Sequence, residues 1–194
     1  MSNRSIHTLL KSWDEECPLT REEAVEVLNL PEEEMDSLME CAYALRTKYK
    51  GKKVSVQLLT NVRSGNCTQN CAYCAQSKDS QAEIEKYKRV SDEKLYGDND
   101  LVDEKHLARH CIGLSGIGFS DEEIEDLADR IREMKKKDTQ ICCSIGFLTE
   151  KQARILKDAG LDRINHNLNS SRSFYPEICT THTYDQRVNN IKML

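Results

Sequence analysis

After Gly51 the sequence alternates short apolar stretches with helical ones, and this alternation constrains the fold more than any other feature. Four stretches have the length and composition of buried strands, at residues 54–59, 110–115, 140–147 and 162–168. Repeated strand–helix–strand units join parallel strands by right-handed crossovers, which predicts the α/β class. A closed (β/α)₈ barrel needs eight units and about 250 residues. The chain is therefore expected to form either a small open sheet or a partial barrel of about four βα units.

Capping residues predict where the helices begin. Ser or Thr followed three residues later by Glu or Gln is a capping box, found at Thr20, Ser120 and Thr149. Thr181 or Thr183 is expected to begin a last helix. The stretch 91–108 is less regular, because Gly-Asp-Asn-Asp at 97–100 interrupts an otherwise helical pattern.

Residues 1–50 are expected to form a separate N-terminal helical segment. Pro31 can begin a second helix there, after the one that starts at Thr20. The first residues show no secretory signal, and no apolar run in the sequence is long enough to cross a membrane. We therefore expect a cytoplasmic location, where cysteines stay reduced and clustered cysteines are ligands or catalytic groups.

The charge balance argues against nucleic acid as a partner. Net charge is −5, and aromatic residues make up only 6% of the 194 residues, so neither a basic face nor a set of stacking platforms is evident. This composition favours a protein that acts on a small molecule.

The loop after the first expected strand carries Cys67, Cys71 and Cys74 in the spacing C-x3-C-x2-C. Soft thiolates suit iron–sulfur clusters and also zinc. Structural zinc prefers paired C-x2-C knuckles with four ligands, and no second knuckle follows here. Three thiolates leave one iron of a cubane cluster without a protein ligand, so that an external molecule can chelate it. The spacing favours an iron–sulfur cluster over zinc.

Alternation along two strands predicts which cysteines point toward the inside of a barrel. Successive side chains of a strand point to opposite faces, and helices cover the outer, apolar face. Cys111 and Cys142 fall on the small, polar face, whereas Cys143 falls on the apolar one. Cys111 and Cys142 are therefore candidate metal ligands. The remaining cysteines are interpreted as ordinary small hydrophobic residues: Cys17, Cys41, Cys143 and Cys179.

The fourth expected strand places three amides on one face. Asn165, Asn167 and Asn169 alternate with apolar residues and His166. Amides would be costly in an apolar core, but they suit the wall of a ligand cavity; turn chemistry at a strand end is the alternative. His166, on the other face, is interpreted as a packing residue with satisfied polar atoms. Arg172 is either a contact for a substrate carboxylate or a surface charge.

The cysteine spacing resembles the signature of the radical S-adenosylmethionine (SAM) enzymes. Within them, the strings NCAYCAQS and INHNLNSSRSFYPEICTTHTYDQR resemble the biotin synthase family, over a match from about residue 20 to the last residue. The resemblance implies that Cys67, Cys71 and Cys74 hold a [4Fe–4S] cluster whose open iron binds SAM. An electron from the cluster then cleaves SAM, and the resulting radical abstracts hydrogen from dethiobiotin.

The same resemblance implies further cofactors and partners. Cys111 and Cys142 would belong to a [2Fe–2S] cluster that donates sulfur, and Tyr73, Asn167 and Asn169 would contact SAM or substrate. The family more often has a carboxylate at the position of Asn169, so this chain would lose a charge-assisted hydrogen bond there. A reductant such as flavodoxin or ferredoxin is implied, and the resemblance is compatible with a homodimer.

Relatives of this kind continue with a cysteine on a fifth strand and an arginine across the barrel, and residues 175–194 supply neither. Residues 51–194 are therefore expected to be the first half of a radical SAM barrel, truncated, with the activity of the isolated chain in question. Two alternatives stay open: another radical SAM enzyme of the hydrogenase-maturation or thiamine-pathway type, and a non-catalytic iron–sulfur-binding fragment. Inward cysteines at both 111 and 142 favour the biotin synthase resemblance over the first alternative.

Overall fold

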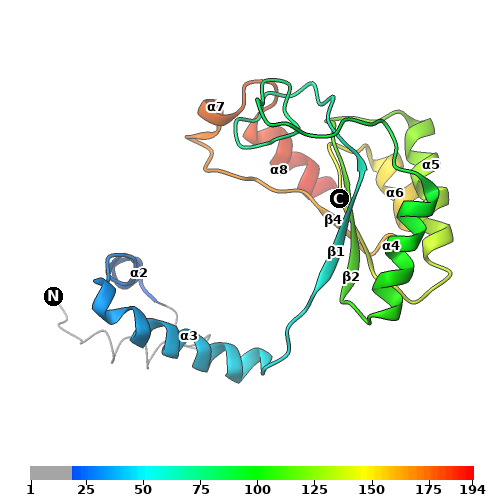
Figure 1. The fold of residues 1–194 in the computed structure, drawn as a ribbon. Coiled ribbons are helices and arrows are strands. Elements are labelled where there is room, and N and C mark those ends of the chain that lie inside the picture. The colour runs from blue at the N-terminus through cyan, green and yellow to red at the C-terminus, as the bar shows by residue number, and fades with distance from the viewer. Residues whose placement is uncertain (1–18) are drawn as a thin grey trace. The chain divides into compact units, whose positions relative to one another are not determined.

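The computed structural model describes residues 19–194, and this part of the chain divides into two compact units on either side of Val54 (Figure 1). The first unit contains α2 (Arg21–Leu28), the short 3₁₀ helix η1 (Glu32–Glu34) and α3 (Met35–Lys50). Thr20 caps α2 with both hydrogen bonds of a capping box, as the sequence predicts. Cys17 lies outside the described residues.

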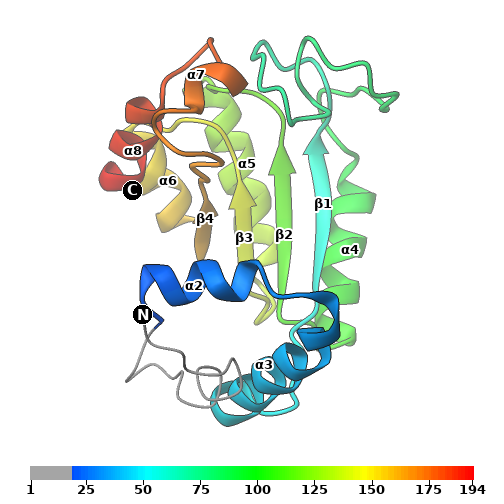
Figure 2. The same cartoon turned by 90° about the vertical axis from the view of Figure 1, so that its left-hand side faces the viewer.

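The second unit is a four-stranded parallel sheet in the order β1-β2-β3-β4. Its strands are β1 (Gln57–Arg63), β2 (Arg109–Leu114), β3 (Ile141–Ser144) and β4 (Arg163–Asn165). Neighbours in the sequence are neighbours in the sheet, as at the start of a (β/α) barrel (Figure 2). This arrangement confirms the predicted α/β class and four βα units.

Three helices cover one face of this sheet (Figure 1): α4 (Asp92–Glu104), α5 (Asp121–Met134) and α6 (Glu150–Asp158). The short α7 (Tyr175–Ile178) and then α8 (Tyr184–Met193) follow the last strand. Ser120, Thr149 and Thr183 make the capping boxes of α5, α6 and α8. Across residues 19–194, none of the helices has both the length and the apolar character required to cross a membrane.

The strand boundaries differ from the predicted ones. The first strand begins at Gln57, because the ladder to β2 starts with the pair Gln57 and Arg109 and leaves Val54 and Val56 70% and 54% exposed. β2 has the expected length, shifted by one residue, whereas β3 and β4 are shorter than expected. β3 already ends at Ser144, and the next residues turn toward the loop after β2, where the Phe147 N–H donates to the Ile117 carbonyl at 2.6 Å.

The hydrophobic core lies between the sheet and its helices. The apolar stripe of α5 is buried in it as predicted, and so are residues from one face of β2 and β3. Its members include Ile112, Ile124, Leu127, Ala128, Ile131, Met134, Ile141 and Cys143. Because successive strand residues alternate, this packing leaves the opposite face of the sheet for other groups.

Residues 97–100 do not interrupt the helix, contrary to the sequence-based expectation, and α4 runs through them. Asp98 and Asn99 are buried and have partners on the sheet, whereas Asp100 is exposed. Thr60 Oγ1 donates to Asp98 at 2.6 Å, and Asn99 Oδ1 lies 3.3 Å from His110 Nδ1. Partners distant in sequence therefore allow a turn-like sequence to remain helical.

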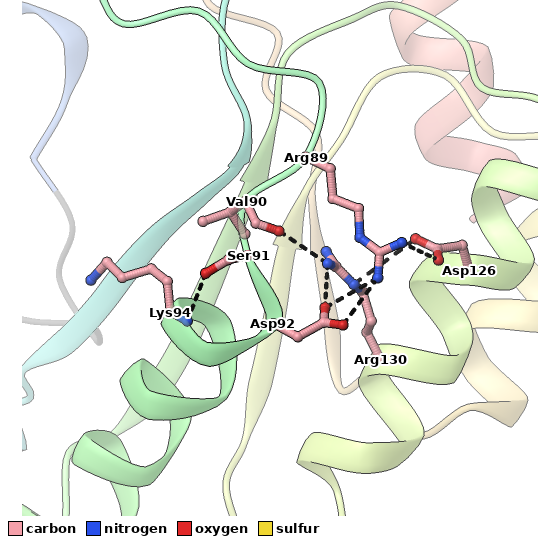
Figure 3. A network of polar contacts seen from close by, with 7 residues as sticks. All are labelled: Arg89, Val90, Ser91, Asp92, Lys94, Asp126 and Arg130. Atoms are coloured by element: carbon pink, nitrogen blue, oxygen red, sulfur yellow. Dashed lines mark hydrogen bonds and ion pairs between the residues drawn. The ribbon is translucent and has the colours of Figure 1, made fainter.

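A buried arginine joins α4 to α5 (Figure 3). The Arg130 side chain is only 3% exposed; it pairs with Asp92 at the start of α4 and donates to the Val90 carbonyl at 3.1 Å. Arg89 contacts both Asp92, at 3.1 Å, and Asp126 of α5, at 2.9 Å. The network fixes the beginning of α4 against α5.

Candidate functional site

A cavity of about 500 Å³ opens on the face of the sheet that the hydrophobic core leaves free. Alternate residues of the strands form its floor, and the loop after β1 forms one wall. The lining residues from the strands and the segments that directly follow them include Gln57, Leu59, Asn61, Cys111, Gly113, Ser115, Ser144, Asn165, Asn167 and Asn169. Cavities of 300–1,000 Å³ with a few convergent polar groups are typical of small-molecule sites.

The loop after β1 carries the three cysteines of the C-x3-C-x2-C motif, and all three line this cavity. It is held by residues near the end of the chain. The Ala72 N–H donates to the Ile178 carbonyl at 2.9 Å, and Asn70 exchanges hydrogen bonds with Thr180 and Thr181. Gly65, at the start of the loop, has φ +70°, which glycine adopts without strain.

Cys71 is the buried member of the three, while Cys67 and Cys74 are half-buried. Its Sγ lies 3.7 Å from Cys179 Sγ. Burial, reinforced by the neighbouring Cys179, raises the pKa of the Cys71 thiol to about 11. Cys179, which the sequence interprets as an ordinary hydrophobic residue, is buried in a small cluster with Cys71 and Tyr175. No spacing pattern could have revealed the pair, because 108 residues separate the two cysteines.

Cys111 and Cys142 are register partners on β2 and β3, so they share one face of the sheet. Cys111 lines the cavity, 3.3 Å from Gln57 Oε1, and Asn165 Nδ2 donates to Cys142 Sγ at 2.9 Å. Burial first, and then Cys142, raise the pKa of Cys111 to about 11. Cys143 belongs to the core under the helices, which confirms the predicted strand register.

The amides of the fourth strand reach the cavity in a different way from the one expected. β4 ends at Asn165, so Asn167 and Asn169 follow the strand; they are not part of it. Asn169 has φ +65°, a left-handed conformation that Asn tolerates. Its Nδ2 donates to Tyr73 OH at 2.5 Å, across the mouth of the cavity. Burial raises the pKa of Tyr73, so its hydroxyl stays protonated near neutral pH.

His166 and Arg172 differ from the other residues that the sequence singled out. The His166 ring packs against Phe147, with centroids 5.3 Å apart, but its buried ring nitrogens make no hydrogen bond, so it is a packing residue without satisfied polar atoms. Arg172 is exposed, pairs with Asp185 and lies over the Tyr184 ring at 4.8 Å. Of its two interpretations, the surface charge is the one that the structure favours.

The donor set of this cavity fits iron–sulfur chemistry. Three thiols from one loop line one wall, and two more lie on or beside the floor, all from residues that the sequence singled out. Thiolates are the usual ligands of such clusters. The amides and the Tyr73 hydroxyl add hydrogen-bond donors and acceptors for a polar organic molecule.

Comparison with known proteins gives consistent results. A family model described as "Radical SAM superfamily" matches residues 61–194. Biotin synthases of Geobacillus kaustophilus (strain HTA426) and Bacillus subtilis (strain 168) are each 40% identical, over 175 and 176 residues. Each alignment covers 90% of this chain but 53% and 52% of the relative, so the chain spans about half the length of these curated relatives.

Solved structures resemble the fold. Methylornithine synthase matches with a TM-score of 0.80 and 16% identity, over 97% of this chain and 55% of that one. The FeFe-hydrogenase maturase HydG from Carboxydothermus hydrogenoformans matches with a TM-score of 0.77 and 20% identity, over 97% of this chain and 44% of the HydG chain. At these identities the likeness concerns the fold alone.

Proposed function

Because the chain belongs to the radical SAM superfamily, we propose that Cys67, Cys71 and Cys74 hold a [4Fe–4S] cluster and that the adjoining cavity binds SAM. The observation that carries the proposal is that all three thiols line one cavity together with Asn165 of β4 and with Asn167 and Asn169, which follow it. When bound, the cluster supplies the electron for reductive cleavage of SAM. The protein contributes binding and orientation.

The protein's own groups are suited to positioning a nucleoside and an amino acid. Tyr73, one residue before Cys74, keeps its hydroxyl proton and so can donate as well as accept hydrogen bonds. Asn167 and Asn169 add two amides to the lining of the same cavity. The hydrogen bond from Asn169 to Tyr73 holds both side chains at the mouth, where they can restrict the access of water.

We assign Cys111 and Cys142 as ligands of a second, [2Fe–2S] cluster and dethiobiotin as the substrate, as in the biotin synthases that this chain resembles. The paired register of the two cysteines on the cavity side supports this assignment. It also favours the biotin synthase reaction over other radical SAM reactions. The complete reaction would insert sulfur into dethiobiotin, with a flavodoxin or ferredoxin as reductant, in the cytoplasm; a homodimer is compatible with the proposal.

Anaerobic reconstitution with iron and sulfide tests the first cluster. We expect one [4Fe–4S] cluster per chain, measured by iron and sulfide content and by electron paramagnetic resonance after reduction. Cys71→Ala should lose it, because two thiolates cannot hold the cubane. Cys41→Ala, a change in the other compact unit, is the control and should retain it. A full cluster in Cys71→Ala would contradict the proposal.

A further inference from the structure

Cys71, Cys179 and His182 form a group of metal-ligating side chains that the proposed function uses only in part. Among residues 19–194, this is the one group of three His, Cys, Asp or Glu residues whose donor atoms all lie within 4.8 Å of one another. All three residues are buried. Cys71 comes from the loop after β1, and the other two come from the turn between α7 and α8, separated by two residues.

Two of the donor-to-donor distances in this group match those of ligands that share a single ion, and the third lies within 4.8 Å. Two sulfurs bound to one tetrahedral zinc ion lie about 3.8 Å apart, because each Zn–S bond measures about 2.3 Å. The sulfurs of Cys71 and Cys179 are 3.7 Å apart. A sulfur and an imidazole nitrogen on the same ion lie about 3.5 Å apart. Cys179 Sγ and His182 Nδ1 are 3.3 Å apart.

The surroundings of His182 admit a metal ligand after a change of tautomer. In the metal-free chain Arg187 Nε donates to His182 Nε2 at 3.1 Å, so Nδ1 carries the ring proton and faces Gln69 Oε1 at 2.8 Å. A metal on Nδ1 requires this proton to move to Nε2, where Tyr175 OH, 2.9 Å away, can accept the N–H. A ligating histidine usually has such a partner, which fixes the ring and its tautomer. Gln69 Oε1, 2.8 Å from Nδ1, offers an oxygen for the fourth position.

We propose that the cluster-free chain binds one zinc ion through Cys71, Cys179 and His182. Zinc prefers this mixture of thiolate and imidazole, and two thiolates balance its charge in a buried site. Binding releases the two thiol protons to solvent and involves no change of oxidation state. Because Cys71 is also a ligand of the proposed [4Fe–4S] cluster, zinc and cluster exclude each other, and zinc competes with cluster assembly.

The test is a zinc titration of the full chain, reduced and metal-free under anaerobic conditions, against a chromophoric chelator. Cys179→Ser should weaken zinc binding by about 100-fold or more, since losing a ligand costs more than losing a supporting hydrogen bond. Cys74→Ser, a loop cysteine outside the group, is the matched control and should bind zinc like the parent. With Co²⁺ as the probe, the thiolate-to-metal charge-transfer absorption should fall in Cys179→Ser and persist in Cys74→Ser.

Reconstitution with iron and sulfide should give the opposite pattern, with the [4Fe–4S] cluster retained in Cys179→Ser and lost in Cys74→Ser. Failure of that iron pattern would refute the proposed function and leave the zinc site standing. Equal zinc affinity in the parent and Cys179→Ser would overturn the zinc proposal, as would equal weakening in Cys74→Ser. Should Cys179→Ser not fold, the zinc test is repeated with His182→Gln, in which an amide replaces the imidazole beside Tyr175.

Discussion

At the scale of single residues, the most unusual environment belongs to His110. It is fully buried on β2, on the helix-covered face, with Nε2 2.8 Å from Thr60 Oγ1 and Nδ1 3.3 Å from Asn99. Burial lowers the pKa of His110 to about 4, although the nearby Asp98 carboxylate opposes the shift. The imidazole is therefore neutral in the folded protein.

The lowered pKa of His110 predicts a pH dependence of stability. Between the unfolded pKa of 6.5 and about 4, the unfolded chain binds a proton that the folded chain does not. His110 therefore contributes its full stability above pH 6.5, and by pH 4 the free energy of unfolding falls by about 3 kcal/mol through this residue. Urea titrations of the cluster-free chain between pH 7 and 4.5 measure the slope.

His110→Asn should remove that part of the slope, whatever it does to stability at pH 7. His106→Asn, which changes an exposed histidine in the turn after α4, is the control and should keep the slope of the parent. An unchanged slope in His110→Asn would show that folding does not lower the pKa of His110.

At the scale of elements, the sequence predicts helix starts better than strand ends. Ser120 and Thr149 were correctly identified because a capping box is a contact between residues three positions apart. Strand ends depend on ladder partners roughly fifty or thirty residues away, as with Gln57 and Arg109, and such partners are invisible to local patterns. The prediction that Asp98 and its neighbours interrupt a helix was wrong for the same reason, because the hydrogen-bond partner of Asp98 is Thr60, 38 residues away.

The candidate site shows the same division. Alternation along β2 and β3 correctly placed Cys111 and Cys142 on the cavity side, because a period of two is a local property. The neighbours of Cys71 could not be predicted, since Cys179 lies 108 residues further along the chain and His182 follows it. The positions of Cys179 and His182 in the sequence do not indicate that they contact Cys71.

Arg130 is the buried side chain of the polar network that joins α4 to α5. Arg130→Ala should lower the free energy of unfolding by roughly 2–4 kcal/mol, because it leaves a buried cavity and removes the bonds to Asp92 and Val90. Arg132→Ala changes an exposed arginine on the same helix and should cost no more than about 0.5 kcal/mol. Chemical denaturation of both variants provides the measurement. Equal losses in the two variants would mean that the buried network adds nothing.

At the scale of the whole molecule, the described residues supply more ligands for the proposed [4Fe–4S] cluster than for the proposed [2Fe–2S] cluster. All three proposed ligands of the [4Fe–4S] cluster lie in one loop. For the proposed [2Fe–2S] cluster, the strands of the described residues 19–194 place two cysteines on the cavity side of the sheet, Cys111 and Cys142. A [2Fe–2S] cluster takes four protein ligands. The second cluster should therefore be the more labile of the two in this polypeptide.

This difference predicts a partial reaction. With SAM, dethiobiotin and a reducing system, the anaerobic 194-residue chain should release 5′-deoxyadenosine without forming biotin. The two products are scored separately by chromatography, and Cys74→Ala should abolish the first. Cys143→Ala, a thiol on the covered face, is the control and should retain it. Biotin formed by this polypeptide would require a sulfur donor other than a cluster held by Cys111 and Cys142 alone.

The hydrogen bonds that hold the cysteine loop have a consequence for synthesis on the ribosome. Asn70 is made early, but its partners Thr180 and Thr181 are made about 110 residues later. At roughly 5–20 residues per second, the loop waits about 5–20 seconds for the residues that hold it in place. During that interval the three thiols are together in sequence but not yet fixed in space. Assembly of the proposed cluster in this geometry therefore belongs to the time after Thr180 and Thr181 have been made.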